Sequence, residues 1–314
     1  MLFFTLYFCL TSQKKRVIIH NYNQAWKGEC AIMLGLVLEG GANRTYYSIG
    51  ILDAFLDNCI EADLLVGVSA GIANGVSYIS GQRGRCLELG RKYINDKRYM
   101  GFRYYFKKGN KSYYNRDFVF REIPESLLPF DYDTFNASTC ETYAVVTNLQ
   151  TGLAEYHRVE SNDKSWSLLQ ASCALPIMFS PIEINGKKYM DGGCADPLPV
   201  RFAFDKGCDK VISILTRERT YSKQTETDVA VSSFLFRRHK EFSNALKSRS
   251  EVYNNSRAFL FEKEREGSAF VFCPQDTSDW KRTEKGSQVL EHIYNQGYDD
   301  AIRRMSELKT FINS

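Results

Sequence analysis

The sequence predicts an α/β fold in which a mostly parallel sheet is flanked by helices. From Met33 onward, short apolar runs of strand length alternate with stretches in which apolar residues recur at helical spacing. The chain has 314 residues, of which 44% are hydrophobic and 25% charged, so it has the composition of a globular protein and the length for a large core. Strands that alternate with helices in this way form mostly parallel sheets.

The first predicted unit is a strand, a glycine turn and a helix. The strand covers residues 35–39, the turn lies at residues 40–41, and the helix follows at residues 46–59. Residues 62–68 are the next apolar run and predict a second strand. The small residues after Ser69 indicate a helix that packs closely against the sheet.

The alternation continues to residue 215. The expected elements are strands at 143–149 and 154–159 around a turn at 151–152, a helix at 163–175, a strand at 188–190, a helix at 197–205 and a strand at 210–215. We therefore predict a core domain at residues 33–215 and a helical or mixed C-terminal region at residues 216–314 that packs on it.

Residues 1–32 are a doubtful N-terminal extension. Their apolar stretch is followed, and not preceded, by the basic residues 14–16, which is the wrong order for a signal peptide. The codons for residues 27–29 can spell a purine-rich ribosome-binding site shortly before Met33. We expect the natural chain to begin at Met33, and a membrane-associating leader is the alternative.

Charge and cysteine content argue against several classes of protein. The net charge is +4, and residues 1–32 contribute +3 of it, so the nearly neutral remainder gives no support to a nucleic-acid partner. The nine cysteines are scattered without a C-x-x-C pair, which argues against a disulfide framework or a zinc site and favours a reducing cytoplasm. No apolar run approaches the roughly 18 residues of a membrane span. The sequence implies no metal and no cofactor.

The stretch LVGVSAG, residues 65–71, places a serine between two glycines at a strand-to-helix junction. In the pattern G-x-S-x-G, Gly67 and Gly71 leave room for a tight turn that exposes the Ser69 hydroxyl at the positive end of the following helix. The pattern therefore predicts a nucleophile. It is weak on its own, so an ordinary serine at a strand-to-helix junction is the alternative.

A nucleophilic serine needs a base. The chain contains four histidines, His20, His157, His239 and His292. None is flanked by the glycines or small residues that usually expose a catalytic histidine, so each fits a solvated or packing position better. Asp191 is the better candidate, because it ends a short strand and is followed by Gly192 and Gly193, which place it on an exposed turn that backbone can approach closely.

A glycine loop follows the first strand and opens the first helix. Its residues are Gly40, Gly41, Ala42, Asn43 and Arg44. Backbone N–H groups at the start of a helix can face an anion. Because the carboxyl ends of parallel strands meet at one edge of a sheet, we expect this loop, Ser69 and Asp191 to lie together.

These three motifs together resemble the patatin-like phospholipase family. LVLEGGANR, GVSAG and DGG occur in the family's order and spacing, within a resemblance that covers about residues 34–215. Further on, ILTRERTY and SRSEVYNNS are similar to stretches of bacterial, cytoplasmic members. The resemblance implies a three-layer fold and a serine acyl hydrolase that acts on lipid or other esters.

The resemblance also implies roles for the site residues. Ser69 would attack an ester carbonyl, and Asp191 would accept its proton in a Ser–Asp dyad and later activate the water that releases the acyl group. Backbone N–H groups of Gly41 and Ala42 would stabilise the oxyanion, and Arg44 would hold the loop or add positive potential.

Two residues depart from the family's loop. Ala42 and Thr45 stand where the family has glycines, and alanine restricts φ, which can misdirect a backbone donor. A catalytically weak or inactive homologue that binds lipid is therefore the alternative function. The sequence leaves open whether phospholipid, neutral lipid or a small ester is the natural substrate.

Residues 83–116 combine eleven basic and two acidic residues with many aromatic ones. One interpretation is a cap beside the active site, in which the aromatic rings are half buried and the lysines are solvated. The other is transient contact with an anionic membrane surface, which agrees with the hydrolase motifs. Single-stranded nucleic acid also suits such a composition, but we expect no nucleic-acid partner.

Overall fold

The computed structural model describes residues 32–163, 165–224, 227–281, 284 and 286–314. The doubtful extension at residues 1–32 lies outside the described residues except for Ile32. The strands are β1 (Leu34–Leu38), β2 (Leu64–Val68), β3 (Glu141–Asn148), β4 (Ala154–Arg158), β5 (Ile182–Ile184), β6 (Lys187–Asp191), β7 (Lys210–Ile214) and β8 (Ala269–Phe272). They form one sheet in the order β5-β6-β3-β2-β1-β7-β8, with β4 also paired to β3.

Five neighbouring strands of this sheet are parallel. They are β3, β2, β1, β7 and β8, whereas β4, β5 and β6 pair in antiparallel fashion at the β3 side. Every residue of β1 and β2 is buried, as expected of parallel strands that are covered on both faces. β8 follows residue 215, so the C-terminal region adds a strand to the sheet.

The longer helices are α2 (Tyr46–Asp57), α3 (Ala70–Ile79), α4 (Arg85–Tyr93), the π-helix η3 (Phe118–Leu127), α8 (Thr227–Leu235), α9 (Lys240–Arg265), α10 (Ser287–Arg303) and α11 (Met305–Asn313). The shorter ones are η1 (Ala42–Thr45), η2 (Phe102–Tyr105), α5 (Tyr132–Ala137), α6 (Ser167–Ser172), η4 (Gly192–Cys194) and α7 (Val200–Asp205). None of the helices in the described part of the chain is both long and apolar enough to cross a membrane.

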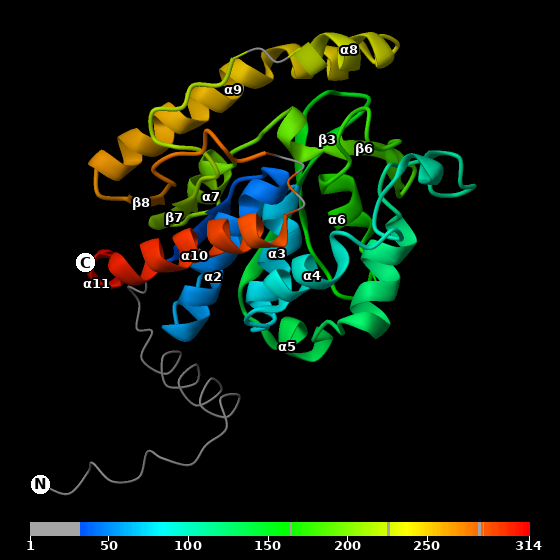
Figure 1. Ribbon diagram of the computed structural model, residues 1–314. Helices are drawn as coiled ribbons and strands as arrows, with labels where there is room; N and C mark the ends of the chain where they lie inside the picture. Colours follow the sequence, from blue (N-terminus) through cyan, green and yellow to red (C-terminus); the bar gives the residue numbers. More distant parts are fainter. Residues whose placement is uncertain (1–31, 164, 225–226, 282–283, 285) are drawn as a thin grey trace, which may run out of the picture.

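Helices cover both faces of the sheet (Figure 1). Successive side chains of a strand point to opposite faces. Leu36 and Leu38 of β1 belong to the apolar cluster that includes α2, α3 and α10, whereas Val37 belongs to the cluster that includes α7 and α9. The predicted three-layer α/β fold with a mostly parallel sheet is therefore confirmed.

The C-terminal helix α10 packs directly on α2, the first helix of the core, and the two lie side by side in Figure 1. Glycines allow this close approach: a Cβ on Gly50 would lie 2.0 Å from the carbonyl oxygen of Tyr294, and a Cβ on Gly297 would lie 2.0 Å from that of Tyr47. The Tyr47 hydroxyl also donates to Asp300 at 2.7 Å. The C-terminal region is thus built into the core.

The helix predicted at residues 163–175 is wrong in its bounds, because only α6 (Ser167–Ser172) forms. The Asp163 carboxylate accepts hydrogen bonds from the backbone N–H groups of Ser165 and Ser167, and Trp166 has a φ of 53°. A side chain that bonds nearby backbone favours a turn over a continuing helix. The other predicted elements are present with ends shifted by a few residues.

Candidate active site

The turn after β2 holds Ser69 in a conformation that is unusual for serine. β2 ends at Val68 and α3 begins at Ala70, so Ser69 alone makes the turn, with φ 54° and ψ −128°. Its backbone N–H donates to the Ser172 hydroxyl at 2.9 Å. Non-glycine residues with positive φ are strained and persist where their surroundings hold them, which happens often at functional sites.

Backbone contacts explain the two glycines beside this serine. A Cβ on Gly67 would lie 2.8 Å from the backbone nitrogen of Ile72, and a Cβ on Gly71 would lie 2.7 Å from the carbonyl oxygen of Leu38. Both distances are too short for real side chains. The strand and the helix can therefore approach at this turn only because both positions lack a side chain.

Asp191 ends β6 and is buried, with 1% of its surface exposed. Its Oδ1 accepts a hydrogen bond from the Gly193 N–H at 2.8 Å, and its own N–H donates to the Ala174 carbonyl at 2.9 Å. A Cβ on Gly192 would lie 2.2 Å from the carbonyl oxygen of Val145, so the turn after the aspartate passes close over β3. Both predicted glycines therefore shape this turn.

The expectation that parallel strand ends bring Asp191 to Ser69 is wrong in its reason. β6 runs antiparallel to β3, and Asp191 pairs with Val146. On the other side of β3, Val68 pairs with Val145. Only β3 therefore separates the two candidate residues, and the register of three strands brings them to the same level of the sheet.

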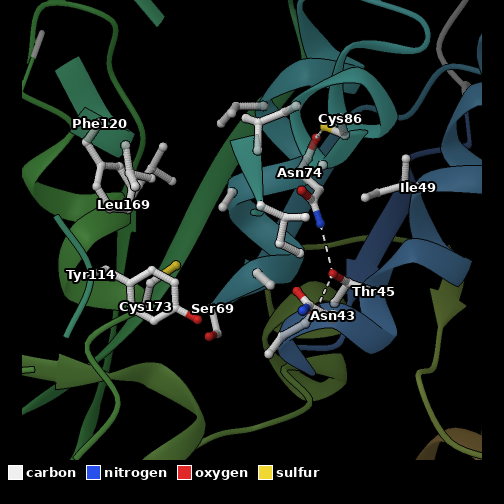
Figure 2. A pocket seen from close by; sticks show the side chains of 18 of the residues that line it. Asn43, Thr45, Ile49, Ser69, Asn74, Cys86, Tyr114, Phe120, Leu169 and Cys173 are labelled. Carbon is white, nitrogen blue, oxygen red and sulfur yellow. Dashed lines mark hydrogen bonds between the residues drawn. The ribbon is translucent and has the colours of Figure 1, made fainter. Parts of the chain in front are cut away.

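The glycine loop forms the short 3₁₀ helix η1 and is held by side chains. The Thr45 hydroxyl donates to the Ala42 carbonyl at 2.6 Å and accepts from the Asn74 amide at 3.0 Å (Figure 2). Thr45, one of the two departures from the family pattern, therefore ties the loop to α3. Ala42, the other, has a φ of 49°, in the left-handed region that favours glycine.

Backbone donors of the loop are available beside the serine. The Thr216 hydroxyl donates to the Gly40 carbonyl at 3.1 Å, and a Cβ on Gly40 would lie 3.1 Å from that of Ser69. Within the part of the chain that the structure describes, the N–H groups of Gly41 and Ala42 have no acceptor. Such groups can stabilise a negatively charged oxygen.

Asn43 and Arg44 of the loop serve different surroundings. The Asn43 side chain donates to the Glu284 carbonyl, in the segment before α10. Arg44 is buried and lines a cavity together with Ser69 and Asp191. The loop is thus connected to the C-terminal region on one side and to the candidate site on the other.

Two cavities of different character meet at Ser69. The larger has a volume of about 200 Å³ and a mostly apolar lining, which includes Ile49, Phe120 and Leu169 (Figure 2). The smaller has a volume of about 60 Å³. Its charged lining residues are Glu39, Arg44, Asp191, Arg217, Lys223 and Arg249. Ser69 lines both cavities.

Two further side chains lie at the serine on the side of the larger cavity. Figure 2 shows the Tyr114 hydroxyl pointing toward Ser69, with Cys173 behind it. Burial and the nearby Asp191 carboxylate raise the pKa of the Cys173 thiol, although a hydrogen bond with Ser69 opposes this rise. Burial also raises the pKa of Tyr114 to about 12. Both groups therefore stay protonated at neutral pH.

The described histidines line neither cavity. His157 contacts Glu155 at 3.0 Å, His292 contacts Gln296 at 3.1 Å, and His239 is exposed just before α9. Within the described residues, two carboxylates share the smaller cavity with Ser69, namely Asp191 and Glu39. The Glu39 oxygens accept from the Thr216 N–H at 2.6 Å and from the Tyr253 hydroxyl at 2.7 Å.

Sequence reasoning missed several residues around the serine. They are Ser172 and Cys173, at the end of α6, and Arg217, Tyr221, Lys223, Arg249 and Tyr253, from the C-terminal region. A signal for part of this set was present, because the stretches ILTRERTY and SRSEVYNNS include Arg217, Tyr221, Arg249 and Tyr253. Their resemblance to other proteins pointed to them but not to their place in the fold.

Ser69, Asp191 and the glycine loop thus line one cavity at the end of β2, in a three-layer α/β fold. The model of the patatin-like phospholipase family matches residues 36–204, which is more than half of the chain, so the chain belongs to this family. A second model, a domain of unknown function (DUF6363), matches residues 239–313.

Among individual proteins, the chain is 26% identical over 189 residues to the uncharacterized protein YjjU of Escherichia coli. This match covers 58% of this chain and 52% of YjjU. It is 25% identical over 198 residues to lysophospholipase NTE1 of Saccharomyces cerevisiae, covering 58% of this chain and 10% of NTE1. The matches therefore span about half or less of these relatives. VipD from Legionella pneumophila shares 12% identity, with a TM-score of 0.40 over 88% of this chain and 67% of VipD.

Proposed function

We propose that this protein hydrolyses lipid esters, with Ser69 as the nucleophile and Asp191 as its base. The observation that carries the proposal is that both side chains line one cavity, with the unbonded N–H groups of Gly41 and Ala42 in the loop beside them. Membership of the patatin-like phospholipase family and relatives named as lysophospholipases support an ester of a lipid as substrate.

The reaction proceeds in two halves. Ser69 Oγ attacks the ester carbonyl carbon while its proton passes to the Asp191 carboxylate, and the N–H groups of the loop hold the oxyanion. The intermediate expels the alcohol, which takes the proton from Asp191. A water then attacks the acyl-serine and gives a proton to Asp191, and the collapse releases the fatty acid and returns the proton to Ser69.

The larger cavity supplies the place for the acyl chain. Its lining is mostly apolar, and it begins at Ser69, where the carbonyl carbon must lie. A chain that leaves water for this cavity gains about 0.8 kcal/mol for each buried CH₂ group. We therefore expect long acyl chains to bind better than short ones until the cavity is filled.

A fluorophosphonate probe tests the proposal, because only an activated serine reacts with it. We expect covalent labelling of the wild-type protein at Ser69, located by peptide mass spectrometry, and no labelling of the Ser69→Ala variant. Labelled protein should also lose hydrolysis of a lysophospholipid. A wild-type protein that resists the probe would instead support the alternative of a lipid-binding homologue without catalysis.

We also propose that the segment at residues 102–111 contacts the surface of an anionic membrane. Phe102 and Phe106 are 75% and 89% exposed, and Lys107, Lys108 and Lys111 beside them are exposed as well. In Figure 1 this part of the chain, in teal, projects from the right edge of the molecule. Exposed aromatic rings flanked by lysines suit the interface of an anionic bilayer.

Co-sedimentation with phosphatidylglycerol vesicles tests this contact. We expect the double variant Phe102→Ser and Phe106→Ser to bind about tenfold more weakly, since two rings no longer leave water. Val289→Ser, which removes an exposed apolar side chain of α10, is the matched control and should bind as the wild type. Equal binding of all three proteins would refute the role of the two phenylalanines.

A cytoplasmic location remains a prediction of the sequence.

A further inference from the structure

Part of the lining of the smaller cavity at Ser69, called its wall below, comes from residues beyond the match to the patatin-like family. Arg217, Tyr221 and Lys223 come from the segment that follows β7, and Arg249 and Tyr253 come from α9. All five follow residue 204, where the match to the patatin-like family ends, and α9 belongs to the region that matches the domain of unknown function. This C-terminal region therefore completes the candidate active site.

The cations of this wall are held in place by neighbouring groups. Lys223 is 8% exposed, and its backbone is fixed by Asn254 of α9, which accepts from its N–H at 2.8 Å and donates to its carbonyl at 3.1 Å. The Lys223 ammonium lies 5.9 Å from the centre of the Tyr253 ring. The lysine is thus kept at the cavity by contacts with two residues of a single helix.

Arg217 and Arg249 approach the site from two sides. Arg217 stacks over Tyr221 at 4.5 Å and donates through Nη1 to the Thr277 hydroxyl at 2.8 Å, while its buried Nε has no acceptor among the described residues. Arg249 Nη2 lies 3.6 Å from the position of a Cβ on Gly193, next to the aspartate turn. Both guanidinium groups therefore belong to the wall around the reacting atoms.

Positive charge predominates in this cavity. Four cations line it, Arg44, Arg217, Lys223 and Arg249, against two carboxylates, Glu39 and Asp191. One of these, Glu39, already accepts two short hydrogen bonds from Thr216 and Tyr253. Because cations outnumber carboxylates in its lining, the electrostatic potential in the cavity is positive and favours an anionic occupant.

We propose that the C-terminal region forms a binding site for a phosphate group carried by the ester substrate, with Arg217, Lys223 and Arg249 as its recognition residues. The proposal rests on the proposed function for the position of the ester at Ser69. The acyl chain then extends into the apolar cavity and the alcohol half into the cationic one. Arginine suits phosphate because its guanidinium group donates two parallel hydrogen bonds.

Binding to the Ser69→Ala protein tests the site without requiring catalysis. Isothermal titration compares a six-carbon monoacylglycerol phosphate with the monoacylglycerol of the same chain. We expect the phosphate to bind at least tenfold more tightly. Arg249→Gln or Arg217→Gln, added to Ser69→Ala, should reduce this ratio to near one. Lys247→Gln, which removes an exposed cation of the same helix, is the matched control and should keep the ratio.

The outcomes separate the two proposals. Equal affinity for the charged and the uncharged lipid in the Ser69→Ala protein would overturn the phosphate site. Tight binding of inorganic phosphate itself, as tight as that of the lipid, would support the anion site but assign it to free phosphate. If the preference for the lipid phosphate holds while the wild-type protein cleaves no ester and resists the fluorophosphonate probe, the phosphate site stands and the proposed hydrolysis fails.

Hydrolysis provides a second measure of the same preference. We expect the ratio of kcat/KM for the lipid phosphate to kcat/KM for the uncharged ester to fall about tenfold in Arg249→Gln. An equal loss for both substrates would mean that Arg249 acts on Asp191 or on the fold, and the recognition role would be refuted.

Discussion

The turns that follow β1 and β2 are neighbours in the sheet and both depend on glycine, but for different reasons. At the β2 turn, the atoms that a Cβ on Gly67 or Gly71 would meet first are backbone atoms. In the β1 loop, a Cβ on Gly41 would meet a side chain, the Thr216 hydroxyl at 2.7 Å. Backbone of a helix or of a central strand cannot move without breaking its hydrogen bonds, whereas a side chain can be replaced.

Positions whose space is limited by a side chain tolerate more variation than positions limited by backbone. The β2 turn requires glycine at both Gly67 and Gly71, on either side of a strained serine. The β1 loop already contains two departures from the family pattern, Ala42 and Thr45, and Thr45 uses its hydroxyl to tie the loop to Asn74. Such compensations are open at Gly41, where a side chain is in the way, but not at Gly40, Gly67 and Gly71, where the first atoms in the way are backbone.

Substitution of Asp191, the proposed base of Ser69, gives the largest expected effect. Asp191→Asn keeps the size of the side chain but removes the base, so kcat for ester hydrolysis should fall on the order of a thousandfold or more. The melting temperature, measured alongside, should show that the variant folds.

Histidine variants are the controls for this prediction. His157→Ala, His239→Ala and His292→Ala should each keep most of the activity, because these side chains line neither cavity at Ser69. Loss of activity in one of them would point to a base other than Asp191.

The backbone contacts at the β2 turn predict the next largest effect. In Gly71→Ala, the new methyl group meets the carbonyl oxygens of Leu38 and Glu39, at 2.7 and 2.8 Å. We expect the free energy of unfolding, measured in urea, to fall by about 3 kcal/mol. A variant with unchanged stability would show that β1 can shift at this point, and the contrast between the two turns would not hold.

In the β1 loop, the effect should fall on catalysis. Gly41→Val should lower kcat on the order of a hundredfold, with little change in KM, because a branched side chain against Thr216 displaces one donor to the oxyanion. Single-turnover kinetics with a soluble ester measures the chemical step. An unchanged kcat would mean that this loop does not stabilise the oxyanion.

A double variant tests the contrast between the two turns. The loss of kcat in Gly41→Ala should be partly reversed by adding Thr216→Ala, which removes the hydroxyl at 2.7 Å and the methyl group at 3.2 Å. No side-chain substitution should rescue Gly71→Ala in the same way. Failure of the Thr216 rescue would mean that backbone limits both turns.

The smallest expected effect concerns Ala42. Its φ of 49° costs an alanine roughly 1 kcal/mol, and glycine avoids this cost but adds freedom to the unfolded chain. Ala42→Gly should therefore raise the free energy of unfolding by less than about 1 kcal/mol, and kcat should stay equal or increase. Thermal unfolding and steady-state kinetics measure the two quantities. A marked loss of stability would show that the methyl group has a packing role.

Much of the fold could be predicted because its signals are local. The apolar runs of β1, β2 and β7 and the helical spacing of α2 lie close to their predicted bounds. The strands β5 and β8, of three and four residues, were missed, because such short runs have no clear pattern. The helix predicted at residues 163–175 was too long, since the capping by Asp163 is a side-chain effect that spacing does not reveal.

The alternation of strands and helices and the candidate residues Ser69, Asp191 and the glycine loop can be predicted from the amino-acid sequence, because turns are specified by residues adjacent in the chain. How these residues meet depends on the tertiary structure. The antiparallel register of β6 on β3 brings Asp191 to the level of Ser69, across β3, and α9 adds Arg249 and Tyr253 to the cavity that both line. These contacts join segments that are far apart in the sequence, so they depend on strand register and helix packing, which local patterns do not encode.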